Sequence, residues 1–468
     1  MSCCGPNRRR VLGAFAAAAL LPLARPVSVR AQVGSVVATD LEVVTITEQS
    51  AVLTWTTLGP NENGDPVPVE TDTEVWLGPV DGALRQVFAD AEPTAFHYAD
   101  VTGLEPGRRY RFEARSFGVP ATPALNVATR LPNTPEATGE FTTAVPPPGR
   151  LLRTIALAND VHYGEEISGL ITAGLPPGVR QEPGLAPYPE VMLAAILDDL
   201  HCPDRAADHL LIAGDLTAEA TPDQVAGVHQ HLASWGTADR DWFACRGNHD
   251  RPHLGSDYAS CEAYLDHFDC WGESFTPRQR LGEFEVGELR LLALDTTELD
   301  SAGGTIDHAQ FDRLREVLLA DPDRPTLVFS HHPVTTESGW SNLAGPGFIL
   351  NAANSAELQA LYRSAPGVFL HHSGHTHRNR RTRPDLAIPV EFLEVAAAKE
   401  YPGGYSLLRI YEGGYTVNFH KTRTANARRW SARSRGEYFG LLPEYTLGAT
   451  ADRNHTVLRD FSGLARAQ

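Results

Sequence analysis

Five short motifs combine aspartate, asparagine and histidine with small residues, and each follows a run of apolar residues. Each motif alone occurs often by chance, and a lone histidine is more often structural than functional. All five in one chain, in this order, are typical of a metal centre with carboxylate, amide and imidazole ligands. The motifs are Asp160-x-His162, Gly214-Asp215, Gly247-Asn248-His249-Asp250, His331-His332-Pro333 and Gly374-His375-x-His377.

The donor atoms in these motifs indicate which ions they bind. Oxygen and imidazole donors without thiolate suit divalent or trivalent transition metals such as Mn, Fe or Zn. Two carboxylates with several neutral histidines can hold two ions, and an aspartate between the ions can bridge both. Small residues such as Gly214 and Gly247 allow the tight turns that aim these ligands. The motifs therefore predict a dinuclear transition-metal site.

The elements that must position these ligands are apolar strands that alternate with helical periodicity after residue 150. This alternation predicts an α/β domain, in which functional residues lie beyond the carboxyl ends of the strands. We expect five strands to bring the motifs to one edge of one sheet. These strands are predicted at 154–158, 210–213, 242–245, 326–329 and 368–370, with helices at 189–200, 221–235 and 310–319.

Residues 36–144 have a different texture, with short alternating apolar runs separated by turn residues. This pattern predicts an all-β sandwich. The segment from Leu104 to Tyr110 is typical of a tyrosine corner, in which a phenol hydroxyl bonds to the preceding loop. With Trp55, it resembles a fibronectin type III domain or the N-terminal sandwich of purple acid phosphatases. That resemblance implies packing or spacing rather than chemistry.

Over residues 153–420, the motifs resemble the complete signature of the calcineurin-like metallophosphoesterases. The resemblance implies an α/β fold in which a β-sandwich is flanked by helices, two bound metals and hydrolysis of phosphate esters. It also implies roles for eight residues. Asp160, His162 and His377 would hold the first metal, Asn248, His331 and His375 the second, Asp215 would bridge them, and His249 would lie beside the scissile phosphate.

Two details refine the placement within this family. Leu294-Asp295-Thr296 and the helix at 310–319 resemble the branch that contains class III cyclic nucleotide phosphodiesterases and glycerophosphodiesterases. Purple acid phosphatases carry a tyrosine three residues after the bridging aspartate, where this chain has Ala218. We therefore expect no ferric-tyrosinate colour.

The resemblance also implies a mechanism. Two ions about 3.5–4 Å apart can clamp phosphoryl oxygens and activate a water molecule or hydroxide for attack on phosphorus. His249 would bond to the phosphate and protonate the leaving alkoxide. We expect a metal-dependent phosphoric ester hydrolase that acts on small phosphodiesters or phosphomonoesters, with phosphodiesters favoured.

Two other functions compete with this hypothesis. The chain could be a non-catalytic surface adhesion or scaffold protein that its metals only stabilise, although the complete set of ligand types opposes this. It could also be a secreted nuclease. The net charge of −18 argues against nucleic acid as the main partner, because binding to a phosphate backbone requires basic surface.

The N-terminus has the organisation of a leader. A basic segment around Arg8 and Arg9 precedes an apolar stretch from Ala14 to Leu23 that is too short to span a bilayer. The paired arginines resemble a twin-arginine signal ending near residue 31. We expect export by the twin-arginine machinery to the periplasm, the cell wall or the outside of the cell. No other stretch predicts a membrane span.

The remaining expectations concern cysteines and domain boundaries. Outside the leader, four cysteines allow three pairings. Cys245 lies in an apolar run and is expected to be a core thiol, whereas Cys261 and Cys270 are the favoured disulfide. The expected organisation is a signal peptide at 1–31, a β-sandwich at 36–144, a Pro-rich linker at 145–150, a metallophosphoesterase domain at 151–422 and a polar tail at 423–468, whose order the sequence leaves open.

Overall fold

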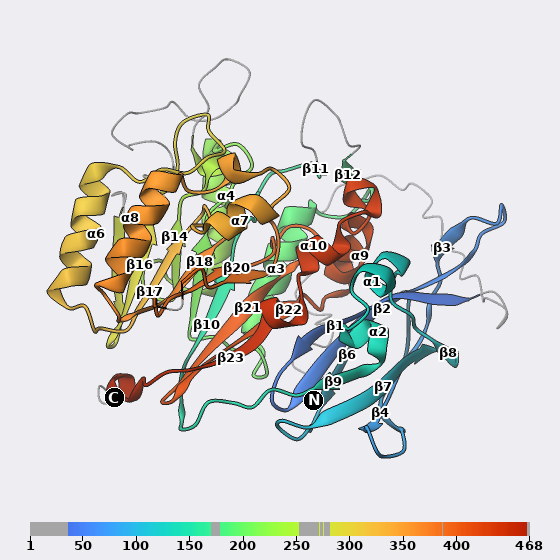
Figure 1. Cartoon of the computed structure of the whole chain (residues 1–468). Helices are drawn as coiled ribbons and strands as arrows, with labels where there is room; N and C mark the ends of the chain where they lie inside the picture. Colours follow the sequence, from blue (N-terminus) through green and yellow to red (C-terminus); the bar gives the residue numbers. More distant parts are fainter. Residues whose placement is uncertain are drawn as a thin grey trace.

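The structure, a computed structural model, describes residues 36–169, 178–251, 281–385 and 387–465, together with Trp271 and Phe275. The described chain forms an N-terminal all-β sandwich and a larger part in which two sheets are covered by helices (Figure 1). This confirms the predicted fold class. The predicted leader and the predicted Cys261–Cys270 pair lie outside the described residues.

The N-terminal part is built as its alternating pattern predicts. Val43 and Phe112, from the two sheets, are fully or almost fully buried in a common core. The tyrosine corner is present, because the Glu105 main-chain N–H donates to Tyr110 Oη at 2.9 Å. One sheet contains β1 (Val37–Ile46), β2 (Ser50–Pro60), β3 (Pro66–Pro68) and β6 (Phe96–Thr102); the other contains β4 (Thr71–Pro79), β5 (Arg85–Thr94), β7 (Arg109–Ser116), β8 (Val119–Pro120) and β9 (Glu140–Thr142). Two short helices, α1 (Leu125–Arg130) and α2 (Pro135–Thr138), precede β9.

The strands that carry the motifs lie in two sheets, so the expectation of a single sheet is wrong. Apolar runs and chain order show where strands occur, but not which strands share hydrogen bonds. The first sheet has the order β14 (Trp242–Cys245), β13 (His209–Ala213), β10 (Leu151–Ala158), β21 (Gly404–Tyr411), β22 (Gly414–Lys421), β23 (Asn454–Leu458). The second has the order β15 (Leu281–Val286), β16 (Leu289–Leu294), β17 (Thr326–Ser330), β18 (Val368–Ser373), β20 (Glu391–Glu394), β19 (Arg380–Thr382).

The two sheets pack face to face around one apolar core. Leu157 of β10 and Leu291 of β16 both belong to this core and are fully buried. Alternate residues of β10, such as Ala156, point to the opposite face and pack with the helices there. Since these strands are covered on both faces, they read as continuous apolar runs in the sequence.

Helices cover both outer faces of the paired sheets (Figure 1). Helices α3 (Tyr188–Leu200) and α4 (Pro222–Trp235) pack on the first sheet, and α6 (His308–Ala320) and α8 (Ala352–Arg363) pack on the second. Thr221 caps α4 and Asp307 caps α6, each accepting a bond from a main-chain N–H of the first turn. Among the described helices, none has the length and apolar character needed to cross a membrane.

The segment 423–468, whose order the sequence left open, is folded from Thr424 to Ala465. Strand β23 extends the first sheet by pairing with β22. The buried Arg453 guanidinium donates to the carbonyls of Val43 and Val44 in the N-terminal sandwich. The elements of this segment are short, and their polar side chains bond to residues far away in the chain. The sequence of the segment therefore shows no regular apolar pattern. The segment contains α9 (Ala425–Ser434), α10 (Pro443–Leu447) and α11 (Thr450–Arg453).

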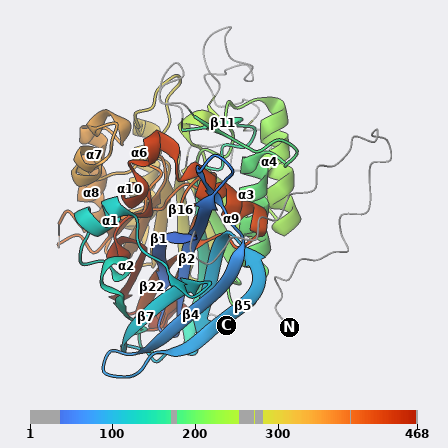
Figure 2. The ribbon, with the colours of Figure 1, turned by 90° about the vertical axis from the view of Figure 1, so that its right-hand side faces the viewer.

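The N-terminal sandwich packs directly against the larger part, with β1 beside β22 (Figure 2). Glu42 of β1 is buried at this contact and accepts from Lys421 Nζ at 3.0 Å. Tyr401 Oη and Arg435 Nε also donate to Glu42, at 2.6 and 3.2 Å. The expected linker follows β9, and its Pro148 carbonyl accepts from Gly413. A buried ion-pair cluster therefore joins the two parts.

Cys245 is a buried free thiol, as expected. Cys202 is disulfide-bonded, and its partner lies outside the described residues. The remaining short elements are β11 (Ile167–Ser168), β12 (Val179–Arg180), α7 (Thr336–Ser341) and the 3₁₀ helices η1 (Asn248–Asp250), η2 (Pro346–Phe348), η3 (Glu437–Gly440) and η4 (Ser462–Ala465).

Candidate metal centre

The two sheets bring all eight predicted site residues to one place. Strands β10, β13 and β14 of the first sheet and β17 and β18 of the second each end just before a motif. The parallel strands within each sheet direct their carboxyl ends to the same side. The residues delivered there are Asp160, His162, Asp215, Asn248, His249, His331, His375 and His377.

Most of these residues have an unusual backbone conformation. A positive φ in a non-glycine residue costs about 1–3 kcal/mol and concentrates at functional sites. Gly247 lies so close that an added Cβ would be 2.2 Å from the Asp215 main-chain nitrogen, which explains the small residue at this position. The residues with positive φ include Asp160 (52°), His162 (48°), Asp215 (52°), His375 (68°) and His377 (51°).

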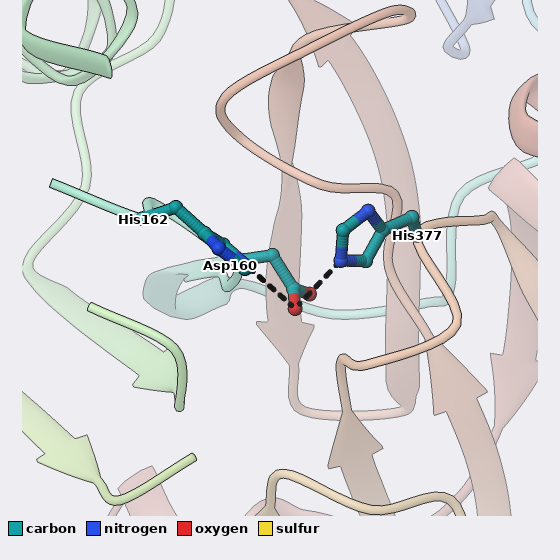
Figure 3. Close-up of side chains that lie close together, drawn as sticks. All are labelled: Asp160, His162 and His377. Atoms are coloured by element: carbon teal, nitrogen blue, oxygen red, sulfur yellow. Dashed lines mark ion pairs between the residues drawn. The ribbon is translucent and has the colours of Figure 1, made fainter. Parts of the chain in front are cut away.

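A first cluster consists of Asp160, His162 and His377 (Figure 3). Asp160 Oδ1 lies 3.2 Å from His377 Nε2 and 3.9 Å from His162 Nε2. Figure 3 shows both rings directed at the Asp160 carboxylate. One oxygen and two imidazole nitrogens thus lie close enough together to share one ion.

A second cluster consists of Asp215, His331 and His375. His331 Nε2 lies 3.2 Å from Asp215 Oδ2 and 3.0 Å from His375 Nδ1. Asn248 Oδ1 also lies 3.0 Å from His331 Nε2. The Asp215 carboxylate reaches the first cluster as well, because its Oδ2 is 3.3 Å from His162 Nε2. Asp215 therefore occupies the position between two potential ion sites.

The donors fit the two metal ions that the motifs predict. Both ring nitrogens of His162 are buried without a hydrogen-bond partner among the described residues, although a buried polar atom normally has one. The clusters offer carboxylate, amide and imidazole donors and no thiolate, a set that suits transition metals.

The electrostatics of the centre also require positive charge. Burial alone would raise the pKa of Asp215 and of Asp160, but the neighbouring histidines outweigh it and hold both values well below the usual range. Burial alone would lower the pKa of His331, but Asp215 outweighs it and raises the pKa to about 9. Metal ions would supply the same positive charge and displace these protons.

His249 lies beside both clusters and is itself held by the main chain. Its N–H donates to Asp215 Oδ1 at 2.9 Å, and its Nδ1 donates to the Ala218 carbonyl at 2.8 Å. The His249 ring centroid is 4.6 Å from that of His162. Burial is the main cause that lowers the pKa of His249 to about 4. The ring is therefore neutral at pH 7, with Nε2 available to a ligand.

Asp250, the last residue of its motif, shapes the loop rather than the clusters. Its buried carboxylate accepts from the main-chain N–H groups of Gly247, Leu216 and Thr217, at 2.9, 3.1 and 2.8 Å. These bonds tie the loop after β14 to the loop after β13. The loops that carry Asn248 and Asp215 are thus held in a fixed relation.

Two polar residues next to the candidate ligands bond to residues outside the two clusters. His332, adjacent to His331, bonds to Thr296 Oγ1 at 2.8 Å. Arg378, adjacent to His377, is buried and donates from Nε to Glu394 at 2.8 Å. Phe348 stacks on His375 with ring centroids 3.7 Å apart, which restricts that ring on one face.

Sequence reasoning missed a charged group behind the first cluster. His377 Nδ1 donates to Glu400 at 2.7 Å, and Lys399 Nζ donates to Glu165 at 2.5 Å. A signal was available, because Lys399 is one of only two lysines in the chain and stands next to an acidic residue, Glu400, after an apolar run.

Part of the chain is similar to known proteins. Residues 153–379 match the calcineurin-like phosphoesterase family. A 3′,5′-cyclic-nucleotide phosphodiesterase from a Nostoc species is 27% identical over 219 residues, which cover 44% of this chain and 73% of the relative. These findings confirm the predicted family for residues 153–379, which form a calcineurin-like phosphoesterase domain and contain all eight site residues.

Solved structures with a similar arrangement include two phosphatases. A purple acid phosphatase from yellow lupin is 14% identical, with 92% of this chain and 75% of that chain covered and a TM-score of 0.42. A dimetal phosphatase from Danio rerio is 15% identical, with 58% of this chain and 98% of that chain covered and a TM-score of 0.42.

Proposed function

We propose that this protein is an exported dinuclear-metal phosphoesterase that hydrolyses small phosphate esters and prefers phosphodiesters. The observation that carries the proposal is the pair of Asp/His clusters that share Asp215. The phosphodiesterase named among the relatives supports the diester preference. Cyclic nucleotides themselves are less suited as substrates, because an exported enzyme would rarely meet them.

The ligand roles follow from the two clusters. Asp160, His162 and His377 would hold one ion, Asn248, His331 and His375 would hold the other, and Asp215 would touch both. Bound ions would supply Lewis acidity at the phosphoryl oxygens and lower the pKa of water.

His249 has the placement to handle the leaving group. Its Nδ1–H is committed to the Ala218 carbonyl, so Nε2 is the atom that faces substrate. An anionic ester beside the ring would raise its pKa from the low value set by burial, and the protonated ring would then donate from Nε2. As the new bond from water oxygen to phosphorus forms and the ester P–O bond breaks, that proton goes to the leaving oxygen.

The test compares the hydrolysis of bis(p-nitrophenyl) phosphate and p-nitrophenyl phosphate by protein loaded with Mn²⁺. We expect faster cleavage of the diester, and loss of both activities in an Asn248→Ala variant. Faster cleavage of the monoester would redirect the proposal to phosphomonoesters. A protein that binds metal but cleaves neither ester would favour the scaffold hypothesis, and salt-sensitive DNA cleavage would favour the nuclease.

We also propose export through the twin-arginine machinery, which rests on the sequence around Arg8 and Arg9. A double change of Arg8→Lys and Arg9→Lys should leave the protein uncleaved in the cytoplasm, measured by cell fractionation. Arg25→Lys, outside the pair, is the matched control. Unchanged export of the double variant would contradict this route.

A further inference from the structure

A buried charged group lies directly behind the first cluster. Glu400 Oε1 accepts from His377 Nδ1 at 2.7 Å, and Glu400 itself is 2% exposed. Lys399 Nζ lies 3.6 Å from Glu400 Oε2 and 2.5 Å from Glu165 Oε2. The other Glu165 oxygen is 3.8 Å from His162 Nδ1. One ammonium therefore joins the two carboxylates that stand behind the two histidines of this cluster.

The second cluster is supported differently. His331 Nδ1 donates to the Ala213 carbonyl at 2.9 Å, and His375 Nε2 donates to the Ala302 carbonyl at 2.9 Å. These partners are neutral main-chain groups. The two potential ion sites thus share Asp215 but differ in the partners of their histidines. A glutamate bonds to His377 in the first cluster, whereas main-chain carbonyls bond to both histidines of the second.

The charged group is anchored by the folded C-terminal segment. Trp430 Nε1 of α9 donates to the Lys399 carbonyl at 2.6 Å. Trp430 also stacks on Tyr188, with centroids 4.1 Å apart, and Tyr188 Oη donates to Glu165 at 2.6 Å. Lys399 and Glu165 are therefore held by α9 and α3, which lie outside the metal-binding loops.

We propose that Glu400 and Lys399 are positioning residues that set the affinity of the first ion site alone. The Glu400 carboxylate fixes the proton of His377 on Nδ1, which leaves the Nε2 lone pair facing Asp160. A carboxylate in this position also strengthens imidazole as a ligand. Lys399 pairs with both Glu165 and Glu400 and offsets part of their negative charge. The inference rests on the dinuclear centre of the proposed function.

The test titrates metal-free protein with Mn²⁺ by calorimetry and counts bound metal after dialysis. The wild type should bind two ions. Glu400→Gln and Lys399→Met should each weaken one of the two sites by about 10–100-fold and leave the other unchanged, as expected for loss of an outer partner. In Co²⁺-loaded protein, the absorption of one site alone should change.

Lys421→Met is the matched control, because Lys421 is also a buried, salt-bridged lysine but lies at the domain contact. It should retain both sites. Glu400→Gln is nearly equal in size to the native residue, so it decides the matter if Lys399→Met fails to fold, as judged by the circular dichroism of the metal-free proteins.

Two results would overturn the inference while leaving the proposed function intact. One is wild-type affinity at both sites in the folded variants. The other is an equal loss at both sites, which would indicate a general structural role. A wild-type protein that binds no metal would instead overturn the proposed function and this inference with it.

Discussion

Lys399 and Lys421 are the two lysines of the chain, and both lie buried against glutamates, but in different regions. Lys421 bonds to Glu42 at 3.0 Å where the N-terminal sandwich meets the larger part. Lys399 bonds to Glu165 behind the candidate metal centre. The chemistry of the two ion pairs is the same. The two ion pairs differ in what their glutamates contact. Glu42 contacts other residues of the domain interface, whereas Glu400, next to Lys399, contacts a candidate metal ligand.

At the domain contact, Glu42 accepts from Lys421, from Arg435 and from the Tyr401 hydroxyl, and Arg435 also pairs with Asp40. Removing its charge leaves the buried Lys421 ammonium without its carboxylate partner, which costs stability. Behind the metal centre, Glu400 contacts His377, a candidate ligand. Of the two buried ion pairs, only the one that includes Glu400 contacts a candidate metal ligand.

The largest expected effect is at the carboxylate shared by the two metal clusters. Asp215→Asn should lower kcat/KM by more than about a thousandfold, since losing even an outer partner of a metal site costs about 10–100-fold. The melting temperature of the metal-free protein should fall, because the histidines that hold the pKa of Asp215 low lose their negatively charged partner. Steady-state kinetics and thermal unfolding measure the two quantities. A loss of less than tenfold would remove Asp215 from its bridging role.

At the domain contact, a substitution is expected to change stability rather than activity. Glu42→Gln should lower the free energy of unfolding by about 3 kcal/mol, because Lys421 loses its buried carboxylate partner and Arg435 loses one of two. The activity of the folded variant should stay close to that of the wild type. Urea denaturation and ester hydrolysis test these statements together. A large loss of activity at unchanged stability would contradict the purely structural role of Glu42.

The charge of Glu42 also makes stability depend on pH. Burial alone would raise its pKa, but Lys421 and Arg435 outweigh burial and lower it to about 2 from 4.5. The stabilisation is therefore present above pH 4.5 and is lost as the pH falls towards 2. Its loss at pH 3 should be about 2 kcal/mol relative to pH 7. Between pH 7 and pH 3, the free energy of unfolding of Glu42→Gln should therefore fall by about 2 kcal/mol less than that of the wild type.

The smallest effect is expected at an exposed pair, which tests whether burial is what matters in both regions. Arg315 Nη2 lies 3.0 Å from Glu357, and both side chains are more than 40% exposed. Glu357→Gln should change the free energy of unfolding by less than about 0.5 kcal/mol, because water screens such pairs. A loss comparable to that of Glu42→Gln would show that ion pairing alone, without burial, explains the interface.

Much of this molecule was predictable because its signals are local. The strands before Asp160, Asp215 and His331 are continuous apolar runs, since they are covered on both faces. Each of these strands is followed by a short motif whose aspartate or histidine can be recognised as a potential metal ligand. The helix at 310–319 and the strand that ends at Cys245 were predictable for the same reason, because each contains its own periodicity or apolar run.

Other features depend on pairing between distant residues. The division of the strands into two sheets follows from hydrogen bonds that chain order does not specify. The segment after Thr424 lacks a periodic pattern, because residues such as Arg453 find their partners in the N-terminal sandwich. Glu165 and Lys399 are separated by 234 residues and meet only in the folded chain.

Short stretches of residue type and spacing were enough to predict the candidate ligands, the phosphoesterase domain and the N-terminal β-sandwich. Only the tertiary structure decided which sheet carries each ligand, how the C-terminal segment is used and which charges stand behind the histidines. The reason is physical. Ligand chemistry resides in side chains, whereas support for a ligand depends on which distant groups are buried beside it.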